Sequence, residues 1–199
     1  MSIKIILIRH GETPLTVKKV YCGITDINLN PAGKEQARKL ALRMRGEKIQ
    51  SVYSSGIARA KNFARLAFDG FQIETIPGLR EMNFGIFEGL THDEIMLKYP
   101  EMYSEWLKNP SGVAIPGGDT FRDFQKRTRR VLTKIAALNK DKIAAVVTHA
   151  GNIKVIIGDI LKSKDIREIN IVPASISIIE FGGAGAVIEL LNDTSYLNE

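Results

Sequence analysis

Several features that mark particular classes of protein are missing from this chain. It has one cysteine among 199 residues, which excludes an intrachain disulfide, and no Cys/His cluster indicates structural zinc. No apolar run approaches the roughly 18–20 residues of a membrane helix. The opening run over residues 3–8 is also too short for the apolar region of a signal peptide. We therefore expect a cytoplasmic protein that does not act on a membrane.

Blocks of like charge, which are typical of nucleic-acid-binding tails, are missing as well. Lysine and arginine together number 28 and aspartate and glutamate 22, which gives a net charge of +6. This surplus fits an anionic ligand, and net charge alone does not choose among phosphate esters, nucleic acid and membrane surfaces. The composition, with 44% hydrophobic and 25% charged residues, is that of an ordinary globular chain. The length suits a single domain over residues 1–199.

Short apolar runs alternate with segments rich in helix formers. This alternation predicts an α/β fold, a three-layer α/β/α sandwich with a mostly parallel central sheet. Asn30 and Pro31 form a helix start, and Ser54 and Ser55 are candidate caps of the next helix. The expected strands are residues 4–8, 50–53, 71–76, 142–148, 175–181 and 186–191, and the expected helices are 31–44, 55–68, 121–138 and 151–161.

Residues 78–118 differ from the rest and are called the excursion below. They are rich in glycine and proline and hold most of the aromatic residues, which predicts a lid-like insertion over one edge of the sheet. Tyr99, Tyr103 and Trp106 either stack on a heterocyclic ligand or pack the excursion against the body, and packing is the favoured interpretation. His92 is expected to be a surface residue of the excursion.

Three segments leave predicted strands with cationic or titratable side chains. They are residues 9–13, 54–59 and 148–151, and they bring Arg9, His10, Arg59 and His149 to one rim of the sheet. Each side chain alone has a structural explanation, such as a packed histidine or a surface charge. Arg59 would lie in the first turn of a helix, where the interaction of a cation with the helix dipole is unfavourable by about 0.3–1 kcal/mol. A bound phosphate would remove that conflict, so the four together indicate an anion site.

A loop carboxylate is also available near these segments. The candidates are Asp26, Glu81 and Glu88. Glu81 follows Arg80 directly, so a local ion pair between the two is the competing explanation for it.

Six blocks of the sequence resemble the histidine phosphatase superfamily, whose members are phosphoglycerate-mutase-like proteins. The resemblance extends over about residues 3–160, in the order of the family. The blocks are residues 7–13 (LIRHGET), 21–26 (YCGITD), 53–60 (YSSGIARA), 79–89 (LREMNFGIFEG), 116–120 (PGGDT) and 147–151 (VTHAG).

The resemblance implies a role for each residue of the rim. His10 would attack phosphorus and become phosphohistidine, which requires its other ring nitrogen to donate to a backbone carbonyl. Arg9, Arg59 and His149 would surround the phosphoryl oxygens, where negative charge develops. Glu81 would protonate the leaving alcohol and later help to deprotonate the attacking water. The chemistry would need no metal and no cofactor.

The implied substrate-binding set also includes Thr16, Cys22 and Gly23. The family commonly has asparagine at the position of Thr16, so this contact is altered here. Mutases of the family usually carry an arginine and a lysine where this chain has Met82 and His92, and they are longer. These departures favour a phosphatase over a phosphoglycerate mutase.

Among the phosphatases, the chain most resembles the α-ribazole-5′-phosphate phosphatase branch of cobalamin biosynthesis. Broad-specificity and phosphoserine phosphatases of the superfamily are nearly indistinguishable from it by sequence. The expected partner is a small phosphomonoester and not nucleic acid, although a non-catalytic anion-binding protein is a less favoured alternative. The oligomeric state is left open, with a homodimer among the candidates.

Overall fold

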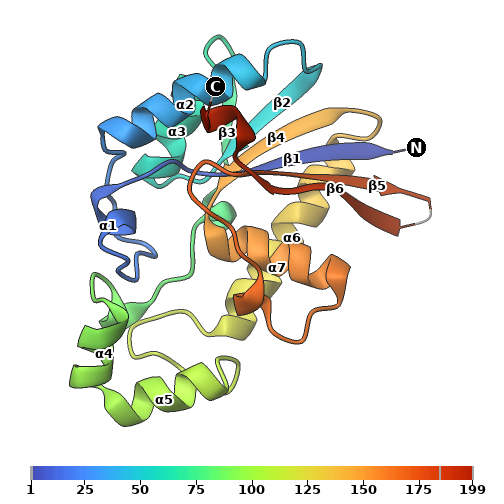
Figure 1. Cartoon of the computed structure of the whole chain (residues 1–199). Helices are drawn as coiled ribbons and strands as arrows, with labels where there is room; N and C mark the ends of the chain where they lie inside the picture. The colour runs from blue at the N-terminus through green and yellow to red at the C-terminus, as the bar shows by residue number, and fades with distance from the viewer. Residues whose placement is uncertain (1, 184, 199) are drawn as a thin grey trace.

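A six-stranded sheet forms the centre of the molecule (Figure 1). The computed structural model describes residues 2–183 and 185–198. The sheet order is β3-β2-β4-β1-β5-β6, with parallel pairing from β3 through β1 and antiparallel pairing of β5 with its two neighbours. The α/β class and the mostly parallel sheet are therefore confirmed. The strands are β1 (Ile3–Arg9), β2 (Ile49–Ser54), β3 (Ile73–Thr75), β4 (Ile143–Thr148), β5 (Ile176–Gly182) and β6 (Gly185–Asp193).

Strand β1 explains why both faces of the sheet are covered. Ile6 and Ile8 pack into one hydrophobic core, whereas Ile5 and Leu7 pack into another. Successive side chains of a strand point to opposite faces, so a continuous apolar run needs cover on both. Helices cover both faces of the sheet, which confirms the three-layer sandwich (Figure 1). The first face is covered by α2 (Pro31–Arg43) and α3 (Ala58–Ala67), and the second by α6 (Phe121–Leu138) and α7 (Ala150–Leu161).

The helix starts agree with the sequence in one case and differ in another. Asn30 caps α2 through its side chain, as predicted. The predicted Ser55 cap of α3 is wrong, because the helix begins at Ala58 and Ile57 occupies its N-cap position. The Ser55 hydroxyl is hydrogen-bonded to His149 and accepts the N–H of Ile57, just before the helix. Instead the Asp26 carboxylate, from a distant loop, accepts the N–H of Ala58 at 2.7 Å. Within the described ranges, none of the helices has the length and apolar character needed to cross a membrane.

The excursion packs around a largely aromatic core that also includes Phe124 of α6 and Val155 of α7. Figure 1 shows its helices, α4 (His92–Lys98) and α5 (Pro100–Lys108), away from the two helical layers. Tyr103 is fully buried, and its hydroxyl lies 2.7 Å from that of Tyr21 and 2.8 Å from Nδ1 of His92. Trp106 stacks on Tyr103 with ring centroids 6.0 Å apart. These contacts favour packing over ligand stacking for Tyr103. That the excursion closes over a ligand stays a prediction.

Candidate active site

His10 lies at the carboxyl end of β1 and is almost fully buried. Its Nδ1 lies 2.8 Å from the carbonyl oxygen of Gly11. A carbonyl only accepts hydrogen bonds, so Nδ1 carries the proton and Nε2 keeps a lone pair. Arg59 donates from its Nε to this Nε2 at 3.1 Å. His10 therefore has the tautomer that the family resemblance implied, with its lone pair facing a guanidinium.

Arg59 is a buried cation held by backbone carbonyls. It is the second residue of α3 and is 1% exposed. Its Nη1 donates to the carbonyl of Thr25 at 2.8 Å, and its Nη2 donates to those of Cys22 and Gly23 at 3.2 and 2.7 Å. It makes no ion pair with a carboxylate of the described residues. The guanidinium is therefore fixed in orientation at a helix N-terminus, where an anion is favoured.

His149 completes the rim from the neighbouring strand, β4. It is fully buried directly before α7, and its Nε2 lies 2.7 Å from Oγ of Ser55. The His10 and His149 rings meet edge to face with centroids 5.1 Å apart. The buried Nδ1 of His149 has no hydrogen-bond partner in the part of the chain that the structure describes. We call Arg9, His10, Arg59 and His149 the His/Arg cluster.

Burial sets the protonation of this cluster. Burial, and then the charges of Arg59 and Arg9, lower the pKa of His10 well below its usual 6.5. Burial and Arg59 also lower the pKa of His149 well below 6.5. Burial lowers the pKa of Arg9 to about 10, although the Glu81 carboxylate opposes this shift. At neutral pH both imidazoles are therefore neutral while Arg9 remains charged.

Glu88 organises the loop that holds Arg59. Its carboxylate accepts from the backbone N–H groups of Gly23 and Ile24, each at 3.0 Å, and from the Thr25 hydroxyl at 2.6 Å. A Cβ on Gly23 would lie 1.8 Å from the Met82 carbonyl, so only glycine fits here. The candidate acid Glu88 thus has a positioning role that residue spacing did not indicate.

Glu81 lies beside the first turn of α7. It is 7% exposed, and its two carboxylate oxygens each accept a backbone N–H at 2.9 Å, from Met82 and from Gly151. Gly151 follows His149 by two residues, so the carboxylate lies next to the His/Arg cluster. A Cβ at Gly151 would lie 2.2 Å from Oε1 of Glu81, and the missing side chain makes room for this carboxylate.

A local ion pair between Arg80 and Glu81 is not present. Arg80 instead makes a two-pronged contact with Asp119, at 2.9 Å for each nitrogen. Arg127 donates to the same carboxylate at 2.9 Å and to the Arg80 carbonyl at 2.7 Å. Behind them, Asn152 donates to the carbonyl of Arg80 at 3.0 Å. The backbone that carries Glu81 is therefore fixed by side chains from α6 and α7.

The remaining predicted substrate-binding residues are committed to internal contacts. Thr16 forms a reciprocal cap with Thr13, and its hydroxyl donates to the Thr13 carbonyl at 2.9 Å. The carbonyls of Cys22 and Gly23 hold Arg59, as described above. Burial raises the pKa of the Cys22 thiol above 9.0. Direct substrate contacts of these three residues stay predictions.

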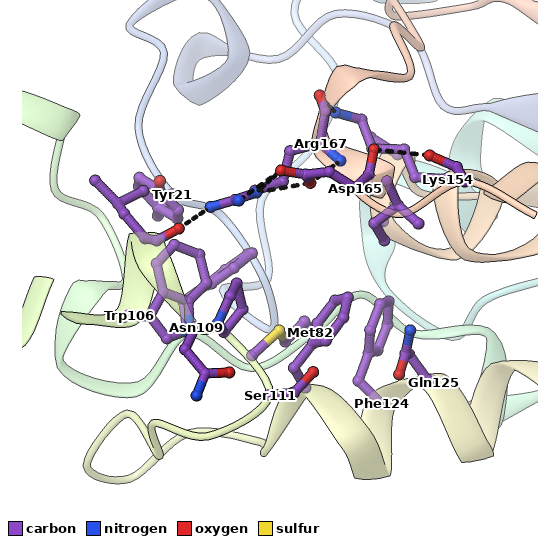
Figure 2. Close-up of a pocket in the computed structure, with 18 of the residues that line it drawn as sticks. Tyr21, Met82, Trp106, Asn109, Ser111, Phe124, Gln125, Lys154, Asp165 and Arg167 are labelled. Atoms are coloured by element: carbon purple, nitrogen blue, oxygen red, sulfur yellow. Dashed lines mark hydrogen bonds and ion pairs between the residues drawn. The ribbon is translucent and has the colours of Figure 1, made fainter. Parts of the chain in front are cut away.

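A cavity of about 660 Å³ opens next to Glu81. Figure 2 shows Arg167 and Asp165 on one side of it and Met82, Phe124 and Gln125 on the other. The Arg167 guanidinium reaches across to the carbonyl of Leu107, at the end of α5. Of the predicted site residues, only Glu81 lines this space. The wall also includes Phe84, Trp106, Phe121, Lys108, Lys154 and Lys164.

The structure thus brings the four rim residues together and adds residues that sequence reasoning missed. Ser55 holds His149, Glu88 holds the Arg59 loop, and Asp119 binds the Arg80 side chain and the Asn83 N–H on either side of Glu81. Asp119 lies in the block of residues 116–120 that resembles the family, but the sequence alone gave it no role. Across residues 2–183 and 185–198, no group of three or more potential ligand side chains could hold a metal ion.

Comparison with known proteins gives consistent matches. A family model described as the histidine phosphatase superfamily (branch 1) matches residues 5–194. A metal-independent phosphoserine phosphatase of Arabidopsis thaliana is 31% identical, over 98% of this chain and 83% of its own length. An α-ribazole phosphatase structure from Shigella flexneri has a TM-score of 0.86 with 28% identity, covering 96% of both chains.

A longer relative is a bifunctional protein of Mycobacterium tuberculosis, which is 33% identical over 98% of this chain. The chain spans 55% of the length of that protein. Similarity therefore extends over nearly all of the present sequence, but over only about half of this relative.

Proposed function

The chain belongs to branch 1 of the histidine phosphatase superfamily, and from this premise we propose that it is a phosphoric monoester hydrolase. The observation that carries the proposal is the state of His10. Its Nδ1 proton is committed to the Gly11 carbonyl, and its Nε2 lone pair faces Arg59. A neutral imidazole with an unprotonated Nε2 is a nucleophile, and the fixed guanidinium that donates to this nitrogen attracts phosphate.

In the first step, Nε2 of His10 attacks phosphorus in line with the ester oxygen. The N–P bond forms as the P–O bond to the alcohol breaks, and Glu81 gives its proton to the departing oxygen. The products of this step are phosphohistidine and the free alcohol. Glu81 suits the acid role because it lines the cavity beside the cluster, where a leaving group has room.

In the second step, water attacks the phosphohistidine. The Glu81 carboxylate takes a proton from the water as its oxygen bonds to phosphorus, and the N–P bond breaks. His10 returns to its neutral form and inorganic phosphate leaves. Arg9, Arg59 and the neutral His149 surround the phosphoryl oxygens in both steps, and the two guanidinium groups supply the positive charge that phosphoryl transfer needs.

The first experiment measures hydrolysis of p-nitrophenyl phosphate in the presence of EDTA. We expect turnover in wild type and none in His10→Ala, because the nucleophile is lost. His92→Ala serves as the matched control, since His92 is an exposed histidine of the excursion. An acid-labile phosphoryl adduct on His10 should be trapped by rapid quench. Turnover that depends on added divalent metal, or that survives in His10→Ala, would contradict the proposal.

For the substrate we propose a small phosphorylated metabolite, with α-ribazole 5′-phosphate as the first candidate. The aromatic side chains of Phe84, Trp106, Phe121 and Phe124 line the cavity, and an α-ribazole phosphatase is among the similar structures. This assignment would place the enzyme in cobalamin biosynthesis. Equal kcat/KM for α-ribazole 5′-phosphate and simple sugar phosphates would refute it.

A second candidate is phosphoserine, and the basic side chains of the same cavity favour it. Three lysines line the wall, and a carboxylate on the substrate would meet them. A phosphoserine phosphatase is also among the similar proteins. Comparing kcat/KM for the two esters separates the candidates.

A further inference from the structure

Building on the proposed phosphatase function, we propose that Ser55 is a positioning residue that fixes the proton of the His149 ring on Nδ1. In this tautomer the neutral ring has a single N–H, which donates to a phosphoryl oxygen of the substrate. Ser55 itself touches neither the substrate nor the reacting atoms. It acts through the ring that it holds.

The hydrogen bonds of the Ser55 hydroxyl carry the first part of the argument. Its Oγ accepts the N–H of Ile57 at 3.2 Å and lies 2.7 Å from Nε2 of His149. A hydroxyl has one proton to donate, and a buried donor without an acceptor is costly. Ser55 and His149 are both fully buried, and among the described residues the hydroxyl proton has no acceptor other than Nε2. Ser55 therefore donates to Nε2.

The consequence falls on the other nitrogen of the same ring. A neutral imidazole has one N–H, so an Nε2 that accepts a hydrogen bond leaves the proton on Nδ1. The position of His149 agrees with this tautomer. It is the N-cap residue of α7, where an unprotonated Nδ1 would meet backbone N–H groups, yet its side chain forms no cap hydrogen bond. The N–H of Gly151, in this first turn, is bound by Glu81 instead.

The Nδ1–H of His149 is thus a buried donor, and it has no partner within residues 2–183 and 185–198. Such a group is costly in the free protein, and a ligand that accepts its hydrogen bond offsets the cost. The surroundings of the ring indicate which ligand this is. The positive charges of Arg59 and Arg9 act on it and help to lower its pKa, and the ring of His10 meets it edge to face. An acceptor at this place is an anionic oxygen, such as the phosphoryl group brings to His10.

The two histidines of the cluster therefore use one tautomer in opposite ways. The Gly11 carbonyl holds Nδ1–H of His10 and leaves Nε2 to attack, whereas Ser55 holds Nε2 of His149 and leaves Nδ1–H to donate. The strand order provides this arrangement, because β4, which precedes His149, lies between β2 and β1. Without Ser55 the other tautomer becomes accessible, and its Nδ1 lone pair repels phosphoryl oxygens.

The first test reads the tautomer by ¹⁵N NMR of the imidazole rings at about pH 8, where neutral imidazoles are observed. The chain has three histidines, and His149→Gln assigns the signals. We expect a protonated Nδ1 and an unprotonated Nε2 at His149 in wild type. In Ser55→Ala, Nε2 loses its donor and the Nε2–H tautomer should appear. A wild-type ring with its proton on Nε2 would overturn the proposal, whether or not any variant folds.

The second test measures inhibition by inorganic phosphate together with hydrolysis of p-nitrophenyl phosphate. Ser55→Ala should raise the inhibition constant and lower kcat/KM, each by about 10- to 100-fold, as for the loss of a hydrogen bond to a charged group. Ser55→Thr keeps the hydroxyl and should restore most of both. Ser54→Ala is the matched control, because Ser54 is equally buried but its hydroxyl donates to the Ser55 carbonyl and not to the ring. It should leave the tautomer and the inhibition constant unchanged.

The outcomes separate this inference from the proposed function. His10-dependent hydrolysis with the wild-type tautomer and inhibition constant in Ser55→Ala would overturn the role of Ser55 and leave the phosphatase intact. An equal loss in Ser54→Ala, with both variants folded, would also overturn it, because the loss would then reflect packing. Absence of His10-dependent turnover on every ester would overturn the proposed function, and this inference with it.

Discussion

At the scale of single residues, adding a side chain at Gly151 tests the catalytic role of Glu81 directly. Gly151→Ala would place a methyl group 2.2 Å from the present position of Oε1 of Glu81. The carboxylate is the end of a flexible side chain, so it should move while the helix remains. We expect kcat to fall by about 10- to 100-fold, part of the usual contribution of general acid catalysis. Steady-state kinetics with thermal denaturation checks this.

A second glycine provides the control for that substitution. A Cβ at Gly56 would meet Thr75 at an ordinary contact distance of 3.4 Å. Gly56→Ala should therefore leave kcat unchanged. Stability of Gly151→Ala should stay within about 1 kcal/mol of wild type, since alanine also favours the helix. If Gly151→Ala kept full kcat, Glu81 would not be the acid in the position described.

At the scale of secondary structure elements, Asp119 ties the start of α6 to the segment that carries Glu81. Burial opposes ionisation of Asp119, but hydrogen bonds from Arg80 and Asn83 outweigh it and lower its pKa below 3.8. Asp119→Asn should cost about 1–3 kcal/mol of unfolding free energy, because the two arginines lose a charged partner and one of its two acceptor oxygens becomes a donor NH₂. It should also lower kcat more than it changes KM, since Glu81 is displaced and the His/Arg cluster is not.

The matched control for Asp119 is Asp159. It also makes a two-pronged contact with an arginine, Arg129, at 2.7 Å, but both side chains are largely exposed. Asp159→Asn should therefore cost less than about 1 kcal/mol and leave kcat unchanged. Urea unfolding and steady-state kinetics on both variants measure these changes in unfolding free energy and kcat. Equal effects of the two substitutions would show that Asp119 has no special link to Glu81.

The loop held by Glu88 gives a prediction of a different kind. In Glu88→Gln, an amide NH₂ would face backbone N–H groups, and some of these would lose their acceptor at about 1–3 kcal/mol each. The carbonyls that hold Arg59 belong to the same loop, so phosphate binding should weaken by about 10-fold or more. Inhibition by inorganic phosphate measures this directly. Glu94→Gln, in an exposed helix cap of α4, should leave the inhibition constant unchanged.

The elements also show which parts of the site a sequence can predict. The run in β1, the Asn30 start of α2 and the bounds of α6 follow from local patterns, and the structure has them. The meeting of His10, Arg59 and His149 follows from strands that end at one sheet edge. The partners of Ser55, Arg80 and Glu88 do not follow, because these contacts join residues that are 39 to 94 positions apart. Only the tertiary fold selects among such pairs.

At the scale of the whole molecule, the buried histidines predict how stability depends on pH. The pKa values of His10 and His149 are lowered by burial, so the unfolded chain binds protons near pH 6.5 and the folded chain does not. Their contribution is complete above that pH and is lost as the pH falls below it, by up to about 1.4 kcal/mol per pH unit for each histidine. Urea unfolding between about pH 8 and pH 5, without phosphate, measures the slope.

Two variants test whether the buried histidines cause this pH dependence of the unfolding free energy. His149→Gln should reduce it, because one buried titrating group is removed. His92→Gln should leave it unchanged, since His92 is exposed. A profile that stays flat between neutral and mildly acidic pH would show that the two imidazoles titrate alike in the folded and unfolded chains.

The contacts between Glu88 and Arg59 have one more consequence. The peptide group that joins Cys22 to Gly23 points its oxygen at Arg59 and its N–H at Glu88, and so does the group that joins Gly23 to Ile24. Each peptide carries a dipole of about 3.5 D, and both are aligned between the two charges. The acid thus balances the guanidinium at a distance, through the backbone. The negative charge that balances Arg59 is that of Glu88, at the other end of these two peptide groups. A phosphoryl group that binds Arg59 therefore has no carboxylate to displace from the guanidinium.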